Sequence, residues 1–418
     1  MSEKHDILKN KNFFLLWLGQ IISQFGDRLN QMALIALVYM RNPGSAFAMA
    51  KLLSFTIIPA FVVGPVAGAY VDRWDRKKTM IFCDLTRSLL VLFIPFVLIK
   101  LPYSAPLYIT VFLIFSISCF FIPSKLSIIP DIVPQEKLLM ANSLTTMSGL
   151  IAVVLGVGIG GPLVEAVGTK GGFMIDAFTY LISAAMIAGI VIKNVPAAVN
   201  KVTITEVIKI EQSIFIDVKE GLRYVITHQD MRFVLATLFI LMSAAGALYV
   251  VFIIFIQETL GTVTKDLGVL AFFLGGGFSL GGIWYGRKGR TISKHLVMYG
   301  GLVCTGLLIS LFAILINETS NIWNAGCLIF LIGCFTGPIV ISANTLVHEV
   351  IAHNMRGRTF SSLGIVMNLG FLIFMFLAST FAEHISRSCI LVSIGVILAV
   401  YGLVGMYILR LRNMSKTM

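Results

Sequence analysis

Twelve long apolar runs follow one another along the chain and dominate what it can fold into. Each is close to the roughly 20 residues that an α-helix needs to cross the hydrocarbon core of a membrane. The runs are continuous and do not alternate with polar residues, which excludes the strands of a membrane β-barrel. They cover residues 13–40, 46–71, 78–100, 105–123, 142–167, 173–193, 231–257, 266–286, 295–316, 322–347, 359–383 and 388–410. The sequence therefore predicts an all-α integral membrane protein with twelve transmembrane helices.

The composition agrees with a bilayer as the surrounding medium. Hydrophobic residues make up 57% of the chain and charged residues 12%, with a mean hydropathy of +0.92. Soluble domains carry about 25% charged residues, so this chain has too few of them to cover a water-facing surface. A soluble, disordered or disulfide-bonded fold is thereby excluded.

The 32 Lys and Arg residues are distributed unevenly between the two sides of the predicted membrane. The N-terminus, the even-numbered loops and the C-terminus hold 24 of them, the odd-numbered loops hold six, and Arg28 and Arg87 lie inside spans. Cytoplasmic loops of membrane proteins carry an excess of Lys and Arg. We therefore expect a multi-pass protein of the cell membrane with both termini cytoplasmic. The net charge of +12 then orients the chain, and no nucleic-acid partner is needed to explain it.

One long polar segment, residues 194–230, divides the spans into two groups of six. It predicts an N-terminal bundle over 1–193, a cytoplasmic linker over 194–230 and a C-terminal bundle over 231–418. Apolar residues recur in the linker at helical spacing, which predicts an amphipathic helix on the membrane surface. A simple linker helix is favoured over a partner-binding element. The recurring apolar residues are Ile214, Phe215, Val218, Leu222 and Val225.

The two predicted bundles also resemble each other in sequence. Gly68, Arg73 and Arg76 after the second span recur 214 residues later as Gly282, Arg287 and Arg290 after the eighth span. Six spans in each half give both halves the same orientation in the membrane. The pattern predicts two pseudo-symmetric six-helix bundles, and transporters built from such repeats bind substrate between the halves.

The loop after the second span carries a family signature. It runs from Gly68 to Lys77 and matches Gly-x-x-x-Asp-Arg-x-Gly-Arg-Lys with one departure, Asp75 in place of the second glycine. The chain thereby resembles the major facilitator superfamily. The Asp-Arg-Trp-Asp-Arg form and the Pro-Asp-Ile-Val-Pro stretch at 130–134 resemble the branch of macrolide and drug exporters, which also includes siderophore and lysophospholipid exporters.

The resemblance implies a monomeric secondary transporter of the drug:proton antiport type that works by alternating access between two bundles. The expected substrate is an amphipathic or cationic small molecule, with protons as the coupling ion and no cofactor. A lysophospholipid or siderophore transporter of the same fold is the alternative.

The same resemblance implies a conformational latch at the cytoplasmic rim. The carboxylate of Asp72 would lie at the N-terminus of a neighbouring helix, expected to begin near Arg358, where the helix dipole favours an anion. Charges that only fix the topology remain the alternative. Asp84 and Arg87 stand three apart on the third span and can pair on one helix face. The latch residues are expected to be Gly68, Asp72, Arg73, Arg76, Lys77, Asp84 and Arg87.

The fifth span contains a glycine-rich stretch that ends in Gly-Pro. Antiporters of the family carry such a motif here, although Glu165-Ala166 replaces the usual paired glycines. Small residues let helices pack closely and bend. Gly158, Gly161 and Pro162 are therefore expected either to pack a neighbouring helix or to form an exporter-specific hinge.

The first span carries a polar stripe on an otherwise apolar helix. Asp27 lies near its midpoint, and a charged side chain at that depth costs about 2.5–3.5 kcal/mol, so it must face a cavity or a partner. Asp27 is the predicted proton-coupling or substrate-binding acid, with a structural ion pair as the alternative. Asp176 and Glu165 are expected at the rim. The stripe consists of Gln20, Ser23, Gln24, Asp27, Asn30 and Gln31.

Signals for catalysis or for a bound metal are weak. His348 and His353 flank Glu349 but stand five apart, whereas a zinc-protease helix needs a spacing of four. No phosphate-binding Gly-x-x-x-x-Gly-Lys-Ser/Thr loop occurs, and the six cysteines form no Cys-x-x-Cys motif. We therefore expect no catalytic residues, no metal site and no cofactor. An integral membrane enzyme, or a receptor that kept the fold and lost transport, are the less favoured alternatives.

Overall fold

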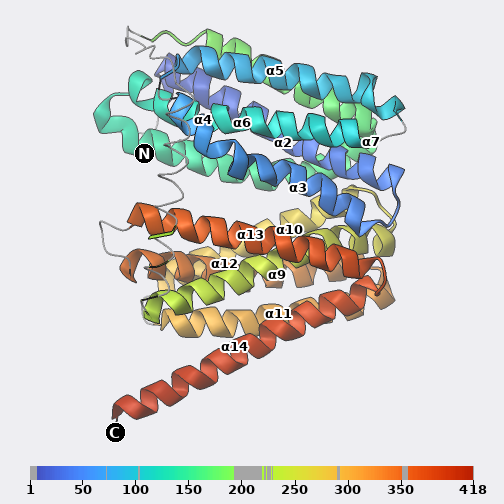
Figure 1. Cartoon of the computed structure of the whole chain (residues 1–418), viewed down its shortest axis with the longest axis vertical. Helices are drawn as coiled ribbons and strands as arrows, with labels where there is room; N and C mark the ends of the chain where they lie inside the picture. The colour runs from blue at the N-terminus through green and yellow to red at the C-terminus, as the bar shows by residue number, and fades with distance from the viewer. Residues whose placement is uncertain are drawn as a thin grey trace. The chain divides into compact units, whose positions relative to one another are not determined.

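The computed structural model describes residues 7–71, 73–101, 104–192, 219–220, 223, 227, 229–289, 292–350 and 356–417. Regular structure in these ranges is helical throughout. The chain divides into two compact units (Figure 1). Unit 1 comprises Met1–Arg41 and Lys51–Ile214, and unit 2 comprises Asn42–Ala50 and Phe215–Met418.

Unit 1 contains the first six predicted spans. Its helices are α2 (Lys11–Arg41), α3 (Ala46–Val62, whose first turn is assigned to unit 2), α4 (Gly64–Val71), α5 (Arg76–Phe96), α6 (Ala105–Ile132) and α7 (Leu138–Ala188). The second predicted span is thus divided between α3 and α4. The fifth and sixth lie on α7, which is interrupted at Gly168 with φ 77° and ψ 166°. This positive φ is a conformation that glycine adopts at little cost.

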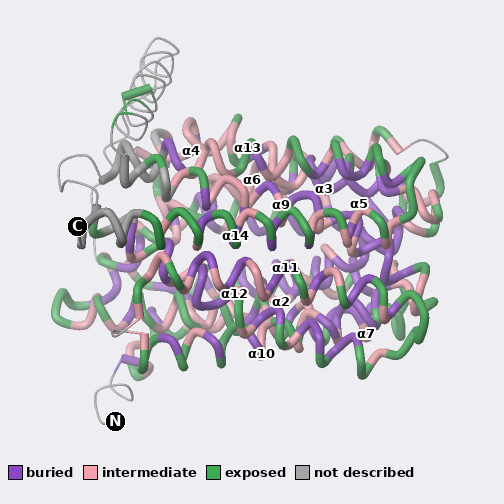
Figure 2. Tube along the Cα trace, turned by 90° about the horizontal axis from the view of Figure 1, so that it is seen from below, coloured by how far each residue is buried: buried purple, intermediate pink, exposed green. Residues whose placement is uncertain are grey.

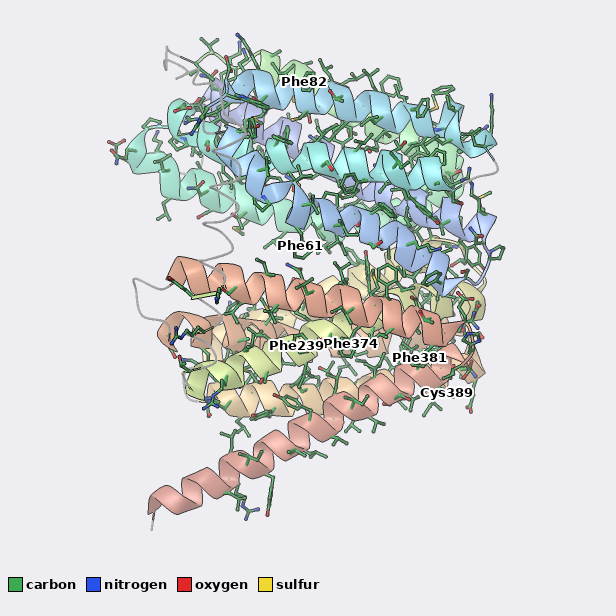
Figure 3. All side chains as sticks on the ribbon, in the orientation of Figure 1. Phe61, Phe82, Phe239, Phe374, Phe381 and Cys389 are labelled. Carbon is green, nitrogen blue, oxygen red and sulfur yellow. The ribbon has the colours of Figure 1, made fainter. Side chains whose placement is uncertain are left out.

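Unit 2 contains the last six predicted spans. Its helices are α9 (Gln229–Leu260), α10 (Lys265–Lys288), α11 (Lys294–Thr319), α12 (Ile322–Val350), α13 (Arg356–Ala382) and α14 (Arg387–Thr417). They pack mainly as pairs: α9 with α13, α10 with α12, and α11 with α14. Figure 3 shows Phe239 and Phe374 at the first of these contacts, where their rings meet edge to face with centroids 6.3 Å apart.

The all-helical membrane fold is confirmed. In the described ranges, nine helices are long and apolar enough to cross a bilayer, and one of them, Gln135–Ala188, has the length of two spans. The polar stripe of α2 lowers its hydropathy, and α3 alone has only 17 residues. Burial follows a face of each helix (Figure 2). Exposed apolar side chains such as Phe82 (68% exposed; Figure 3) cover the opposite face, as expected for helices in lipid.

Glycines allow the α10–α12 pair to pack at backbone distance. Gly277 and Gly281 stand four apart on α10, and Gly333 and Gly337 stand four apart on α12. A Cβ atom at Gly281 would lie 2.8 Å from the carbonyl carbon of Cys334, and one at Gly337 would lie 2.6 Å from the carbonyl oxygen of Phe278. The two helices therefore interlock through reciprocal Gly-x-x-x-Gly pairs, the arrangement that replaces hydrophobic driving force inside a membrane.

Two sequence expectations differ from the structure. The fourth span ends at Ile132 and not at 123, so Lys125 lies inside a helix instead of in a cytoplasmic loop. Residues 42–50, predicted within the first bundle, belong to unit 2, where the Glu383 carboxylate accepts from Ser45 Oγ and from the Phe47 amide, each at 3.0 Å.

Most of the predicted linker helix lies outside the described residues. Its described members are helical and exposed, as a water-facing side of such a helix requires; they are Lys219, Glu220, Arg223 and Thr227.

Candidate functional site

Helix α2 lies against both parts of α7, and small residues make the approach close. A Cβ atom at Gly26 would lie 2.5 Å from Asp176 Oδ1 and 3.0 Å from Thr179 Cβ, both after the break in α7. Before the break, a Cβ atom at Gly156 would lie 2.9 Å from Arg28 Cβ. Glycine at these positions lets the polar stripe of α2 reach the side chains of α7.

Asp27 meets Tyr180 in this contact. The Tyr180 hydroxyl donates a hydrogen bond to Asp27 Oδ1. Tyr180 is fully buried, whereas Asp27 is half-buried. The hydrogen bond from Tyr180 therefore links Asp27, the acid predicted at the centre of the first span, to the buried interior of unit 1.

Tyr180 in turn covers Arg87 of α5. The guanidinium carbon lies 4.4 Å from the centroid of the Tyr180 ring and 4.4 Å from that of Phe121, so the cation is held between two aromatic faces. Arg87 also forms a buried ion pair with Asp84, and Arg87 and Asp84 are 4% and 0% exposed at their side chains. The pairing predicted from their spacing is present, and it lies beside Asp27.

A third carboxyl group, that of Asp176, lies on the same side of α7. Asp176 is fully buried and accepts from Thr179 Oγ1 at 3.3 Å, with the Asn30 side chain as a further partner. It was expected at the rim, but the chain reverses at Gly168, eight residues earlier, and Asp176 packs against Gly26 of α2 in the interior of the unit. Within the described ranges, its Oδ2 atom and Oδ1 of Asn30 are buried without a hydrogen-bond partner.

These groups form one charged cluster, which we call the Asp27 cluster: Asp27, Asp84, Arg87, Lys125, Asp176 and Tyr180. Asp27 interacts electrostatically with each of the others. Lys125, half-buried on α6, is the second cation.

Three carboxyl groups face two cations in the Asp27 cluster. If all were ionised, one negative charge would be left without a partner, which costs several kcal/mol in a buried site. The cluster can remove that cost by taking up a proton or the cationic group of a ligand. The first option gives a proton carrier, and the second gives a cation-binding site.

The remaining stripe residues lie around this cluster. Gln20 and Asn30 are buried. Gln31 accepts from Arg28 at 3.0 Å, and Gln24 Oε1 lies 3.2 Å from a Cβ atom built at Gly149. Arg28 is thus held on its own helix and does not join the cluster.

The structure separates the predicted latch residues into two places. Asp84 and Arg87 lie in the Asp27 cluster. Arg76 instead pairs with Asp131 at 2.6 Å, and Lys77 donates to the carbonyl oxygens of Ala188 and Ile190 at 2.8 Å each. Through Arg76 and Lys77, the start of α5 is thus bound to the ends of α6 and α7.

The structure explains why an aspartate can replace the second glycine of the loop signature. Asp75, the departure from the family pattern, is the N-cap of α5, and its Oδ1 accepts from the Lys78 amide at 3.0 Å. The Arg73 amide donates to the carbonyl oxygen of Tyr70 at 3.0 Å, and a Cβ atom at Gly68 would meet nothing within 4 Å. Asp72 lies outside the described residues.

The glycine-rich stretch of α7 contains Gly158 and Gly161, both buried, and Pro162 within the helix. The non-helical backbone of α7 occurs at Gly168 and not at this stretch. In the described ranges, no three His, Cys, Asp or Glu side chains are grouped as a metal site.

Two members of the cluster were not singled out from the sequence. Lys125 was assigned to a loop, although the apolar residues Leu126, Ile128 and Ile129 after it show that the run continues. Tyr180 carried no signal beyond being one of several aromatic residues in spans, because its role depends on which helix packs beside it.

The chain was compared with known proteins. The family model of the Major Facilitator Superfamily matches residues 16–374. Macrolide efflux protein A of Streptococcus pyogenes is 24% identical, with 92% of this chain and 92% of that protein covered. The putative bacilysin exporter BacE of Bacillus subtilis is 25% identical, with 87% of each covered.

Solved structures show the same fold at low sequence identity. A bacterial homologue of the iron transporter ferroportin, in an inward-facing state, aligns with a TM-score of 0.72 at 13% identity over 95% of this chain and 98% of that one. The peptide transporter POT aligns with a TM-score of 0.67 at 14% identity over 96% and 94%. The predicted family is thereby confirmed: the chain belongs to the Major Facilitator Superfamily and is a multi-pass membrane transporter.

Proposed function

We propose that this transporter exports an amphipathic or cationic small molecule in exchange for protons, by alternating access. The observation that carries the proposal is the surplus carboxyl group of the Asp27 cluster. A proton and a substrate cation neutralise that surplus equally well, so binding of one favours release of the other. Such competition for a single negative charge is the simplest physical basis for antiport.

Asp27 is the member of the cluster that exchanges its partner. Asp84 and Asp176 are fully buried, whereas Asp27 is half-buried and hence the most accessible of the three carboxyl groups. Tyr180 orients the Asp27 carboxylate, and the Arg87–Asp84 pair holds Tyr180 in place through its ring. Tyr180 and Arg87 are therefore positioning residues.

The relatives support the direction of transport. Two of them are a macrolide efflux protein and a putative bacilysin exporter. We infer efflux for this chain as well, with antibiotic resistance as a consequence where the substrate is a drug. We further propose that it acts as a monomer in the cell membrane. A lysophospholipid or a siderophore is the alternative substrate, and the transport assay that follows includes both.

Transport in everted membrane vesicles tests the proposal. A macrolide, a lysophospholipid and a siderophore are offered with and without an imposed proton gradient. We expect gradient-dependent uptake of at least one cationic or amphipathic compound, and loss of that uptake in Asp27→Asn. Glu318→Gln is the matched control, because Glu318 is an exposed carboxyl group on α11 outside the cluster. Gradient-driven uptake at the normal rate by Asp27→Asn would refute the assignment.

The orientation rests on the distribution of Lys and Arg. We propose that both termini are cytoplasmic, since 23 of 32 basic residues fall on that side of the predicted topology once Lys125 is placed inside α6. Fusion of a reporter that is active only in the cytoplasm to the C-terminus should give an active reporter. Activity of a reporter that works only outside the cell would overturn the orientation.

The conformational latch at Asp72 is also kept as a proposal. The rigid attachment of Arg76 and Lys77 to neighbouring helix ends supports it, because it gives the loop before them a fixed base. Asp72→Ala should change the rate at which cysteines in the transport cavity react with a thiol reagent from the cytoplasmic side. An unchanged rate would count against the latch.

A further inference from the structure

Unit 2 contains an apolar groove that plays no part in the Asp27 cluster. It lies between α10, α11 and α12 and has a volume of about 550 Å³. Its walls consist of hydrophobic side chains, glycines and the thiols of Cys304 and Cys334. None of the described residues that line it is charged, so the groove suits a hydrocarbon ligand.

Neighbouring glycines on α11 give the groove its depth. A Cβ atom at Gly301 would lie 2.6 Å from Ile339 Cγ1, so this glycine lets α11 approach α12. A Cβ atom at Gly300 would meet nothing within 4 Å, although Gly300 lines the groove. The space that a side chain at position 300 would fill is therefore part of the open groove, and helix packing does not require a glycine there.

The wall from α10 ends in basic residues. Leu280 and Trp284 line the groove, and Arg287 and Lys288 follow Trp284 by three and four positions, which places them on the same helix face. Both cations are exposed. The distance from Leu280 to Lys288 is about 12 Å along the helix axis.

The α11 side of the groove reaches the same basic end. Lys294 precedes the lining residue Val297 by three positions and pairs with Glu349 of α12. Arg287 and Lys288 therefore lie at the same end of the groove as the Lys294–Glu349 ion pair. A Trp beside basic residues at the end of a membrane helix is typical of the interface where lipid head groups lie.

We propose that the groove binds one acyl chain of an anionic phospholipid, whose head group is held by Arg287 and Lys288. The apolar walls match the acyl chain, and the exposed basic side chains at the groove end match the phosphate. The binding is independent of proton coupling at Asp27, and it makes the protein sensitive to the anionic lipid content of the leaflet on that side.

The test uses the full chain in nanodiscs and spin-labelled phosphatidylglycerol and phosphatidylcholine as probes. Motionally restricted phosphatidylglycerol is expected in excess over phosphatidylcholine in the wild type. Gly300→Leu should remove this excess, because the leucine fills the groove. Gly286→Leu should retain it, since a side chain at Gly286 also meets nothing within 4 Å but lies outside the groove.

A second variant keeps the test decisive if Gly300→Leu does not fold. Arg287→Gln with Lys288→Gln should lower phosphatidylglycerol affinity about twenty-fivefold, because each basic residue near an anionic surface contributes about fivefold. Lys9→Gln with Lys11→Gln removes equal charge from two exposed positions in unit 1 and should leave the affinity unchanged. Equal retention of the two lipids by the wild type would overturn the proposal. So would displacement of the bound lipid by a transported macrolide, because the groove would then belong to the substrate.

Discussion

The contact between α2 and α7 makes Gly26→Ala a sharp test of how the Asp27 cluster is assembled. The added Cβ atom would lie 2.5 Å from Asp176 Oδ1, whereas ordinary van der Waals contact begins at 3.4 Å. The shortfall is 0.9 Å on that atom and 0.4 Å on Thr179 Cβ, which lies at 3.0 Å, and Thr179 Oγ1 is closer still. Since both belong to α7, the two helices must move apart by about 1 Å.

The expected cost follows from three contributions. Overpacking costs about 1–3 kcal/mol, and alanine in place of glycine in a helix returns about 1 kcal/mol. A 1 Å separation also breaks the hydrogen bond from Tyr180 to Asp27, and a bond to a charged group is worth about 1.5–3 kcal/mol. The sum is a destabilisation of about 1.5–5 kcal/mol.

Thermal unfolding of the detergent-solubilised protein, followed by intrinsic fluorescence, measures the stability, and everted vesicles measure transport. Gly26→Ala should unfold at a lower temperature and lose gradient-driven uptake. Gly286→Ala is the control, because a Cβ atom there meets nothing within 4 Å and only the gain in helix propensity remains. If Gly26→Ala were as stable as Gly286→Ala and transported normally, the close contact would not be what positions Asp27.

Three further predictions concern neighbouring contacts. Asp27→Asn and Tyr180→Phe should each impair transport. The double variant should be no worse than Asp27→Asn alone, because both substitutions act through one hydrogen bond. Additive losses in vesicle uptake would contradict this. Arg87→Met should destabilise the protein by about 3–5 kcal/mol, because it leaves Asp84 unpaired. Adding Asp84→Leu should restore most of the melting temperature. A double variant no more stable than Arg87→Met would refute the pairing. Asp75→Ala should cost about 1 kcal/mol through loss of the N-cap of α5, whereas Asp75→Ser should keep most of it, as thermal unfolding of the two variants will show.

Much of the fold could be predicted from local patterns. Whether a run of residues crosses a membrane depends on its own length and polarity, so each predicted span lies on a helix. The break between spans five and six was predicted between residues 167 and 173, and the backbone of α7 leaves helical geometry there, at Gly168, whose positive φ redirects the chain. The end of the fourth span was predicted too early, because Lys125 was interpreted as the start of a cytoplasmic loop.

The candidate site was only partly predictable. The spacing of Asp84 and Arg87 correctly indicated a pair, since three positions along a helix bring side chains together wherever the helix lies. Their assignment to the cytoplasmic latch came from the resemblance to the family's loop signature. The helices that their side chains face depend on how the spans pack, which that signature does not encode.

The sequence by itself determined the medium, the helical class, the family and the presence of one acid in the middle of the first span, because each depends on residues close together in the chain. Only the tertiary structure decided that Asp27 meets Tyr180, that Tyr180 and Phe121 enclose Arg87, and that Lys125 faces the same interior. These contacts join four helices across wide separations in sequence. Their geometry is set by where glycines allow backbones to touch, and that is a property of the packed bundle.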